Sequence, residues 1–191
     1  MIADRPSSPD LGLLAQLGEA YRTHGGCCPG FWALAVHRFG QWRYRIRPRW
    51  LRAPFYVAYR VAFTLVQVAT GIELPCEVVC GRRLRIEHHS GIIINGTARF
   101  GDDCVLRNGV TVGVRHTNVP GAPVFGDRVD VGAGAAVLGP IRIGDDVAIG
   151  ANAVVITDVP DHSLAVGVPA RIVPRRRAAV GAPPARRRES A

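Results

Sequence analysis

Hydrophobic residues recur at every sixth position over the second half of the chain, a period that suits neither an α-helix nor an ordinary strand. One column comprises Phe125, Val131, Val137, Ile143, Ile149 and Val155, and glycine directly follows four of them, at positions 126, 132, 144 and 150. A second column comprises Val129, Ala135, Ile141, Val147 and Ala153. Each six-residue unit therefore buries two side chains and turns at the glycine, which predicts a β-solenoid.

The same columns start earlier in the chain and are interrupted twice. Their earlier members are Cys80, Ile86, Ile92, Ile94, Ala98, Phe100, Cys104, Leu106, Val110 and Val112. The step from Ile86 to Ile94 covers eight residues where six are expected, and the step from Val112 to Phe125 covers thirteen where twelve are expected. An inserted residue cannot join the inward columns, so it bulges outward and presents its side chain at the surface.

The residues in the two breaks are suited to proton transfer and to the binding of carboxylates. The first break holds His88, His89 and Ser90, and the second holds Arg115 and His116. Imidazole acts as a base near neutral pH, and the guanidinium group pairs with carboxylates. Because solenoids with a flat face commonly associate around a rotation axis, we expect a homotrimer in which one subunit's His88 bulge faces its neighbour's His116 loop. The alternative is that both breaks are solvated loops without a chemical role.

Three helical patterns precede the repeat. The first covers residues 11–21 and is ended by a pair of glycines, and the second covers residues 31–42 and is stopped by Pro48. The third runs over residues 54–69, with Gly71 just past its end, as helix ends prefer. The remaining histidines, which we expect on the surface or on a helix face, are His24, His37 and His162.

These patterns predict a mainly β protein with three parts. A short α-helical region covers residues 1–71, a parallel β-helix of hexapeptide repeats covers residues 72–173, and a basic disordered tail covers residues 174–191. About a hundred residues at three hexapeptides per coil make about five coils.

Composition indicates a cytoplasmic protein without a membrane span. Apolar residues make up 48% of the chain, yet no run of eighteen apolar residues occurs, and no basic-then-apolar leader pattern begins it. Five cysteines give no disulfide framework, so we expect reduced thiols, with Cys80 and Cys104 as apolar fillers of the inward columns. A metal site is not expected.

The net charge of +9 does not by itself indicate a nucleic-acid partner. Six of the 24 basic residues, all arginines, lie among the last 17 residues, so the folded part is only mildly basic. We expect the tail to be solvated, with contacts to an anion such as a nucleotide phosphate as an alternative.

Longer stretches of the chain resemble a known family. The segments IELPCEVVCGRRLRIEHHSGIIINGTA, NGVTVGVRH, DVGAGAAVLGPIRIGDDVAIGANAVV and VGVPARIV are similar to the left-handed β-helix of the hexapeptide-repeat acyltransferases, and within them to the serine O-acetyltransferases. The helical segment FWALAVHRFGQWR is weakly similar to the last helices before that β-helix. The resemblance implies acetyl-CoA-dependent acetylation of L-serine to O-acetyl-L-serine, for cysteine biosynthesis.

The resemblance also implies roles for individual residues. His88 matches the general base, and Glu73 matches the carboxylate, usually aspartate, that orients it. Glu87 stands where the family usually has an aspartate that contacts the amino acid, and Arg115 and His116 match the pair that holds its carboxylate. Acetyl-CoA, the co-substrate, is then expected along the coil edge, near Gly113, Ala133, Ala151 and Arg171.

The departures from the family pattern concern the acceptor and the partners. The helical region is shorter than in full-length family members, and no segment matches the one that adds an aspartate to the acceptor pocket. The last residues, Arg-Glu-Ser-Ala, lack the isoleucine that docks into the cysteine-synthesising enzyme, so that complex is not expected, while a dimer of trimers stays open.

Three alternatives to the serine enzyme stay open on the residues. The acceptor is another small hydroxyl compound, such as a sugar or an intermediate of a specialised metabolite; or the chain is a non-catalytic scaffold; or it is a trimeric zinc lyase on the same fold. The last needs three histidine ligands, and no pair of histidines has the spacing for it.

Overall fold

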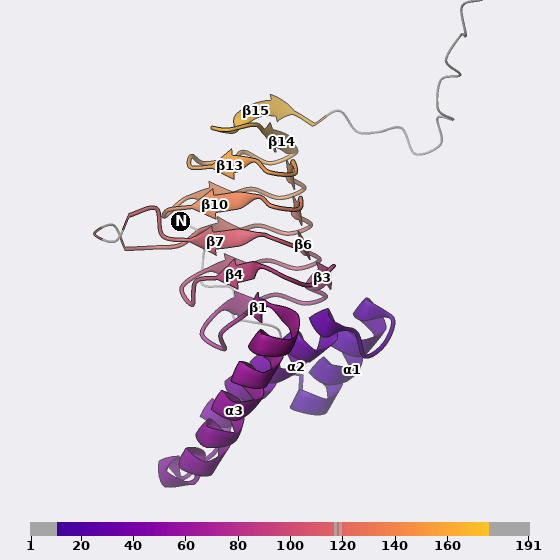
Figure 1. Ribbon diagram of the computed structural model, residues 1–191, viewed down its shortest axis with the longest axis vertical. Coiled ribbons are helices and arrows are strands. Elements are labelled where there is room, and N and C mark those ends of the chain that lie inside the picture. Colours follow the sequence, from indigo (N-terminus) through magenta and orange to yellow (C-terminus); the bar gives the residue numbers. More distant parts are fainter. Residues whose placement is uncertain (1–10, 117, 119, 176–191) are drawn as a thin grey trace, which may run out of the picture.

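The computed structural model describes residues 11–116, 118 and 120–175. Within these ranges, helices come first and a stack of short parallel strands follows (Figure 1). The helices are α1 (Leu13–His24), α2 (Pro29–Trp42) and α3 (Arg52–Thr70), with two short 3-10 turns, η1 (Arg43–Arg45) and η2 (Arg49–Leu51), between α2 and α3. The tail predicted for residues 174–191 lies outside the described residues, apart from its first two.

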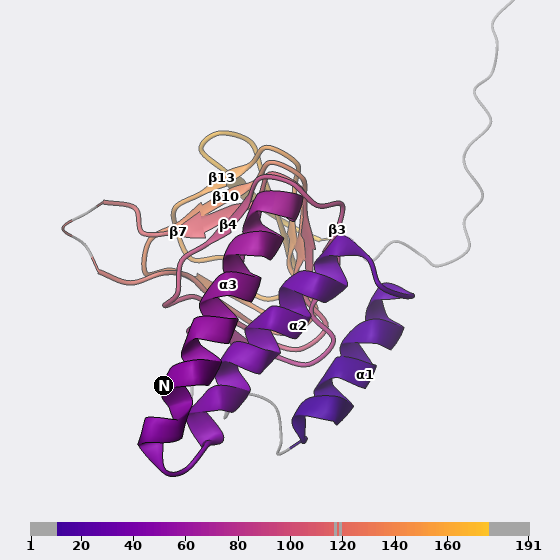
Figure 2. The ribbon, with the colours of Figure 1, turned by 60° about the horizontal axis from the view of Figure 1, so that its bottom comes forward.

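The helix boundaries follow local sequence signals. α1 ends at Gly25 and α3 ends at Gly71, each with a φ of 68°, a left-handed conformation that glycine adopts without steric cost. Pro29 occupies the first turn of α2, where a missing N–H costs nothing. α2 ends before Pro48, which stands between the two 3-10 turns. Figure 2 shows α2 lying between α1 and α3 beneath the strands.

The strands form three sheets, each contributing one strand to a coil. Sheet A contains β1 (Ile72–Glu73), β4 (Ile92–Ile94), β7 (Thr111–Gly113), β10 (Ala136–Leu138) and β13 (Val154–Val155). Sheet B contains β2 (Val79–Cys80), β5 (Arg99–Phe100), β8 (Val124–Phe125) and β11 (Arg142–Ile143). Sheet C contains β3 (Arg85–Glu87), β6 (Val105–Arg107), β9 (Asp130–Val131), β12 (Ala148–Ile149), β14 (Ser163–Val166) and β15 (Arg171–Pro174).

The predicted parallel solenoid of about five coils is confirmed. Sheet A has five strands in the order β1-β4-β7-β10-β13, all parallel, so the chain returns to this sheet once per coil. Every residue of the two predicted hydrophobic columns, from Cys80 to Val155, is buried, with at most 8% of its surface exposed. The change from helix to strand occurs between Thr70 and Ile72. The division into domains stays a prediction.

Both ends of the solenoid are closed by other parts of the chain. At the first coil, three side chains of α2 reach backbone carbonyls that have no strand beneath them: His37 and Gln41 contact Val78, and Arg38 donates to Cys80 and Gly81. At the last coil, β15 pairs antiparallel with β14, a hairpin that the repeat pattern does not predict. Covered ends prevent further strands from adding to the stack.

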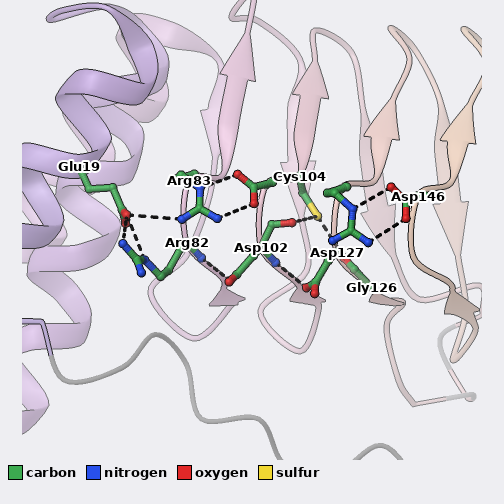
Figure 3. Close-up of polar contacts among 10 residues, drawn as sticks. Glu19, Arg82, Arg83, Asp102, Cys104, Gly126, Asp127 and Asp146 are labelled. Atoms are coloured by element: carbon green, nitrogen blue, oxygen red, sulfur yellow. Dashed lines mark hydrogen bonds and ion pairs between the residues drawn. The ribbon is translucent and has the colours of Figure 1, made fainter. Parts of the chain in front are cut away.

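Stacked charges line the corner between sheets B and C (Figure 3). Arg83 pairs with Asp103 of the next coil at 2.5 Å, and Arg128 pairs with Asp146 at 2.7 Å. In the neighbouring column, Asp102 accepts a hydrogen bond from the amide of Arg82 at 2.8 Å, and the pattern repeats up the corner through Asp127, Asp145 and Asp161. These contacts fix the register between coils far from the two breaks.

Candidate functional site

The first break is the turn that carries the chain from β3 in sheet C to β4 in sheet A. We call this edge of the solenoid the C–A corner. Glu87 of β3 pairs with Arg107 of β6, and the Gly109 amide donates to the Ser90 carbonyl at 2.9 Å. Gly91 stacks on Gly109, since a Cβ on Gly91 would lie 3.4 Å from the Cα of Gly109. Three residues, His88, His89 and Ser90, separate Glu87 from Gly91, whereas Asn108 alone separates Arg107 from Gly109, so this turn of the first coil has two extra residues. The predicted bulge is therefore present.

The backbone of this turn is strained. His88 has a φ of 60° and Ser90 a φ of 99°, both in the left-handed region that side chains rarely occupy. The φ of His88 is shared by residues of the corner between sheets B and C, such as Arg83 and Arg128, so by itself it marks a tight turn, which surrounding contacts hold. Here the contacts come from the end of α3: the Ile92 amide donates to the Gly71 carbonyl at 3.1 Å, and a Cβ on Gly71 would lie 3.1 Å from the Cα of Ser90. The side chain of His88 is exposed.

Glu73 lies on the outer face of sheet A, beside this turn. Its neighbours Ile72 and Leu74 are buried, so its own side chain points outward, and it pairs with Ile93 of the strand that the His88 turn enters. The carboxylate accepts a hydrogen bond from the side chain of Gln67, in the last turn of α3, at 3.1 Å. Within the described ranges no hydrogen bond joins the His88 ring to Glu73, so the catalytic pairing of these two residues stays a prediction.

Glu87 lies on the outer face of sheet C, next to His88, and is held by two arginines. One carboxylate oxygen is 2.8 Å from Arg85 and the other is 3.3 Å from Arg107. Arg107 also pairs with Asp130, one coil further on, and this hydrogen bond is the main cause that raises the pKa of Arg107. The four side chains form a chain of alternating charge whose sum is zero.

The second break is the loop between β7 and β8, which extends outward from the stack (Figure 1). Arg115 and His116 are both exposed in it. Arg115 packs beside Gly139 of the next coil. A Cβ added to Gly139 would lie 3.4 Å from the Cβ of Arg115. The loop leaves the end of a sheet A strand, whereas the His88 turn enters the start of one. In one chain the two breaks therefore lie at opposite edges of sheet A.

The residues predicted to hold acetyl-CoA divide between these edges. Ala133 and Ala151 lie at the C–A corner, two and three coils above the His88 turn, and the Asn152 amide donates to the Ala133 carbonyl at 2.8 Å. Arg171 is exposed at the start of β15 and follows Ala170, whose amide donates to β13. Gly113 lies at the opposite edge, beside the second break.

Glycine occupies the same point of the C–A corner in the first three coils, and Asn152 occupies it in the fourth. Gly91, Gly109 and Gly134 stack so closely that a Cβ on Gly109 would lie 3.3 Å from the Cα of Gly134. Their φ values lie between 67° and 72°, which explains why glycine recurs at this point of the coil. The edge is therefore a shallow backbone surface that an extended ligand can approach closely.

Two other features lie away from this corner. A cavity of about 500 Å³ opens between α1, α2 and the first coil, and its lining, which includes Gln16, Arg38 and Glu77, contains none of the predicted site residues. In the described part of the chain, no group of three or more His, Cys, Asp or Glu side chains is arranged to hold a metal ion. No helix among the described residues is long and apolar enough to cross a membrane.

The sequence is similar to curated proteins across most of its length. A serine acetyltransferase of Helicobacter pylori is 40% identical over 156 residues, which cover 78% of this chain and 84% of that protein. One of Mycobacterium tuberculosis is 39% identical over 164 residues, which cover 82% of this chain and 66% of that protein. The chain belongs to the serine acetyltransferase family. No family model matches it.

Solved serine acetyltransferases share the fold. The soybean apoenzyme has a TM-score of 0.72 at 28% identity, covering 84% of this chain and 69% of that one. A serine acetyltransferase in complex with CoA has a TM-score of 0.65 at 30% identity, covering 78% and 58% of the two chains. The Neisseria gonorrhoeae enzyme in complex with serine has a TM-score of 0.66 at 29% identity, covering 84% and 67%. This chain thus spans about 58 to 84% of the serine acetyltransferases named here.

Two residues of the site region, Arg107 and Gln67, were not indicated by the sequence. Arg107 lies twenty residues after Glu87, one coil of eighteen plus the two inserted residues, so counting the break into the coil length would have placed it. Gln67 has no comparable signal, because its position depends on how α3 meets the first strand. His37 does lie on a helix face, as expected, and that face is fully buried against the first coil.

Proposed function

We propose that the protein is an acetyl-CoA-dependent O-acetyltransferase whose acceptor is L-serine. The observation that carries the proposal is the C–A corner, where the inserted turn that presents His88 stands at the base of an edge lined by glycine and alanine. Membership of the serine acetyltransferase family supports the acyl donor and the acceptor. Similar solved proteins bind CoA in one case and serine in another.

The proposed mechanism is a direct transfer in which His88 is the general base. The imidazole takes the proton of the acceptor hydroxyl as that oxygen attacks the thioester carbon of acetyl-CoA, and backbone N–H groups stabilise the resulting oxyanion. The intermediate then expels the CoA thiolate, which receives the proton from the imidazolium. Glu73 holds the imidazole in the tautomer whose free nitrogen faces the hydroxyl. No acyl-enzyme forms.

The acceptor clamp comes from a second subunit in this proposal. His88 and Arg115 lie at opposite edges of sheet A in one chain, so a single pocket that contains both requires the edge of a neighbour. A trimer with rotational symmetry supplies this arrangement three times. Arg115 and His116 of one subunit then hold the acceptor carboxylate beside the His88 of the next, and Gly113 approaches the CoA bound along Ala133 and Ala151.

One observation favours a second acceptor class. Both carboxylate oxygens of Glu87 are already paired with Arg85 and Arg107. An α-ammonium group must share this carboxylate with two guanidinium groups, whereas a hydroxyl acceptor without an amine meets no such competition. Small hydroxy acids are therefore the alternative acceptors.

The test is release of CoA thiol from acetyl-CoA with L-serine, 3-hydroxypropionate and a panel of sugars. We expect L-serine to give the highest rate, and His88→Ala to lower it by about 10²- to 10⁴-fold, the usual contribution of a general base. His162→Ala is the matched control, because that histidine is exposed at the far corner, beside Asp146. The proposal is contradicted if the wild type releases no thiol with any of the acceptors, or if His88→Ala and wild type release it at the same rate.

A further inference from the structure

The two carboxylates beside the His88 turn are held by different kinds of partner. Glu87 is paired with two guanidinium groups, at 2.8 and 3.3 Å. Glu73 accepts a hydrogen bond from the neutral side-chain amide of Gln67 at 3.1 Å, and within residues 11–175 as described it forms no ion pair. A neutral donor orients a carboxylate without cancelling its charge, whereas arginine does both.

This difference decides which carboxylate can assist the base. A carboxylate raises the proton affinity of a nearby imidazole through its negative charge, and the effect depends on a fixed orientation. The charge of Glu87 is already compensated, while that of Glu73 is not. Glu73 also faces outward on sheet A, on the strand next to the one that the His88 turn enters.

The end of α3 contacts both the side chain of Glu73 and the turn that carries His88. Gln67 holds Glu73, and four residues later Gly71 closes the helix with its amide donated to the Gln67 carbonyl at 2.8 Å. Gly71 in turn lies against Ser90 and Gly91 of the His88 turn. The same helical turn therefore sets the backbone of His88 and the side chain of Glu73.

We propose that Gln67 is a positioning residue, which fixes the Glu73 carboxylate so that it orients and polarises the His88 imidazole without neutralising it. The proposal rests on the proposed function for its effect on rate. Its effect on the imidazole is independent of whether an acceptor has been found.

Two variants separate the parts of this proposal. Gln67→Met keeps the length of the side chain and removes the donor, while Gln67→Lys keeps a donor and adds a positive charge. The side chain is half-buried near the end of a helix, so both replacements have room to fold. Gln41→Met is the matched control, because Gln41 also donates a side-chain amide hydrogen bond, to Val78, away from the corner.

The first measurement is the pH titration of the His88 ring by NMR, with the signal assigned through His88→Asn. We expect the midpoint to fall in Gln67→Met and to fall further in Gln67→Lys, with no change in Gln41→Met. In a Glu73→Gln background Gln67→Met should leave the midpoint unchanged, whereas Gln67→Lys should still lower it through the direct repulsion of its charge. An unchanged midpoint in Gln67→Met, or an equal change with and without Glu73, overturns the proposal.

The second measurement is the kinetics of thiol release. We expect Gln67→Met to lower kcat about tenfold, with KM for acetyl-CoA within about twofold of wild type, because the ground state contacts are unchanged. A loss confined to KM contradicts a role through the base. If the wild type transfers no acetyl group to any acceptor, the proposed function fails, and the NMR titration alone decides the role of Gln67.

Discussion

Arg107 stands directly opposite Glu87 in the pairing of β3 with β6, and its guanidinium group lies 3.3 Å from one oxygen of the Glu87 carboxylate. Arg85, two residues before Glu87 on the same strand, lies 2.8 Å from the other oxygen. The carboxylate that the family resemblance assigns to the acceptor is therefore shared with two cations of the protein itself. A carboxylate can accept about four hydrogen bonds, so room remains for a ligand, but in competition.

Arg107→Leu should increase the preference for an acceptor that carries an amine. The change frees one oxygen of Glu87 and leaves Asp130 without its guanidinium partner, so the local charge becomes more negative. We expect the ratio of kcat/KM for L-serine to that for 3-hydroxypropionate to rise about tenfold, the size of one charge-assisted hydrogen bond. Arg128→Leu, which removes the pair with Asp146 at the far corner, should leave the ratio unchanged. A fall in the ratio would show that Arg107 supports the amine contact instead.

Mixed trimers should recover activity from two inactive variants. His88→Ala and Arg115→Ala damage opposite edges of sheet A, so a site between subunits is intact wherever each chain contributes its unaltered edge. In a trimer that contains both variants, one of the three sites meets this condition, so about one third of the sites are intact after purification of mixed trimers. Co-expression of the two variants with different tags, followed by purification through both tags, allows the measurement.

The control for this experiment is the same purification with two tagged copies of one variant, which should show no recovery. Absence of recovery in the mixed trimers, with a trimer confirmed by light scattering, would place both residues of each site in a single chain.

His37 should make the folded state sensitive to acid. Burial, with a smaller contribution from Arg38, lowers the pKa of His37 to about 3, against an ordinary value of 6.5. Below pH 6.5 the unfolded chain binds a proton that the folded chain does not, so the free energy of unfolding falls as pH falls from 6.5 to about 3. At about 1.36 kcal/mol per pH unit, the loss between pH 6.5 and 4.5 is about 2 kcal/mol.

Urea unfolding at pH 7.0, 5.5 and 4.5 measures this dependence. His37→Gln retains a donor for the Val78 carbonyl and should flatten the dependence by about 2 kcal/mol over that range, whatever its effect at pH 7. His162→Gln, at an exposed position, should leave the dependence as in wild type. An equal pH dependence in His37→Gln and wild type would exclude His37 as the cause.

The five thiols should differ sharply in reactivity. Burial raises the pKa of Cys80 and of Cys104 to about 12, so almost no reactive thiolate is present at pH 8, while Cys27 is exposed. With a disulfide reagent such as DTNB, we expect one fast-reacting thiol in the folded protein and five in denaturant. Cys27→Ser should remove the fast phase. If the phase persists in Cys27→Ser and is lost in Cys28→Ser, the half-buried Cys28 is the reactive thiol instead.

The hydrophobic columns show which parts of the structure a sequence can predict. A repeat of six residues states directly which side chains point inward, and every member from Cys80 to Val155 is buried. The breaks were located for the same reason, because an insertion changes the spacing, but the size expected for the second was wrong. β6 pairs with β9 at an offset of 25 residues, seven more than a coil of eighteen, where one extra residue was expected. The insertion within His88, His89 and Ser90 therefore followed from counting alone, and the structure adds the positive φ of His88 and Ser90.

Contacts between unlike elements could not be predicted in this way. Arg38 donates to two carbonyls of the first coil, and nothing in its helix indicates which strand lies opposite. Gln67 contacts Glu73 only because Gly71 turns the chain sharply at the end of α3. The antiparallel strand β15 likewise has no period that distinguishes it from a loop. Docking geometry, unlike periodicity, depends on shape and on several residues at once.

The stacked charges at the corner between sheets B and C also bear on how such a chain can change in length. Successive coils place Arg83, Asp103, Arg128 and Asp146 at the same point of the turn, so the sign of the charge alternates from coil to coil. Deleting the single coil that carries Arg128 would bring Asp103 and Asp146 together, and like charges in contact repel. Deleting or duplicating two adjacent coils restores the alternation. Along this corner, coils are best gained or lost in pairs over evolution.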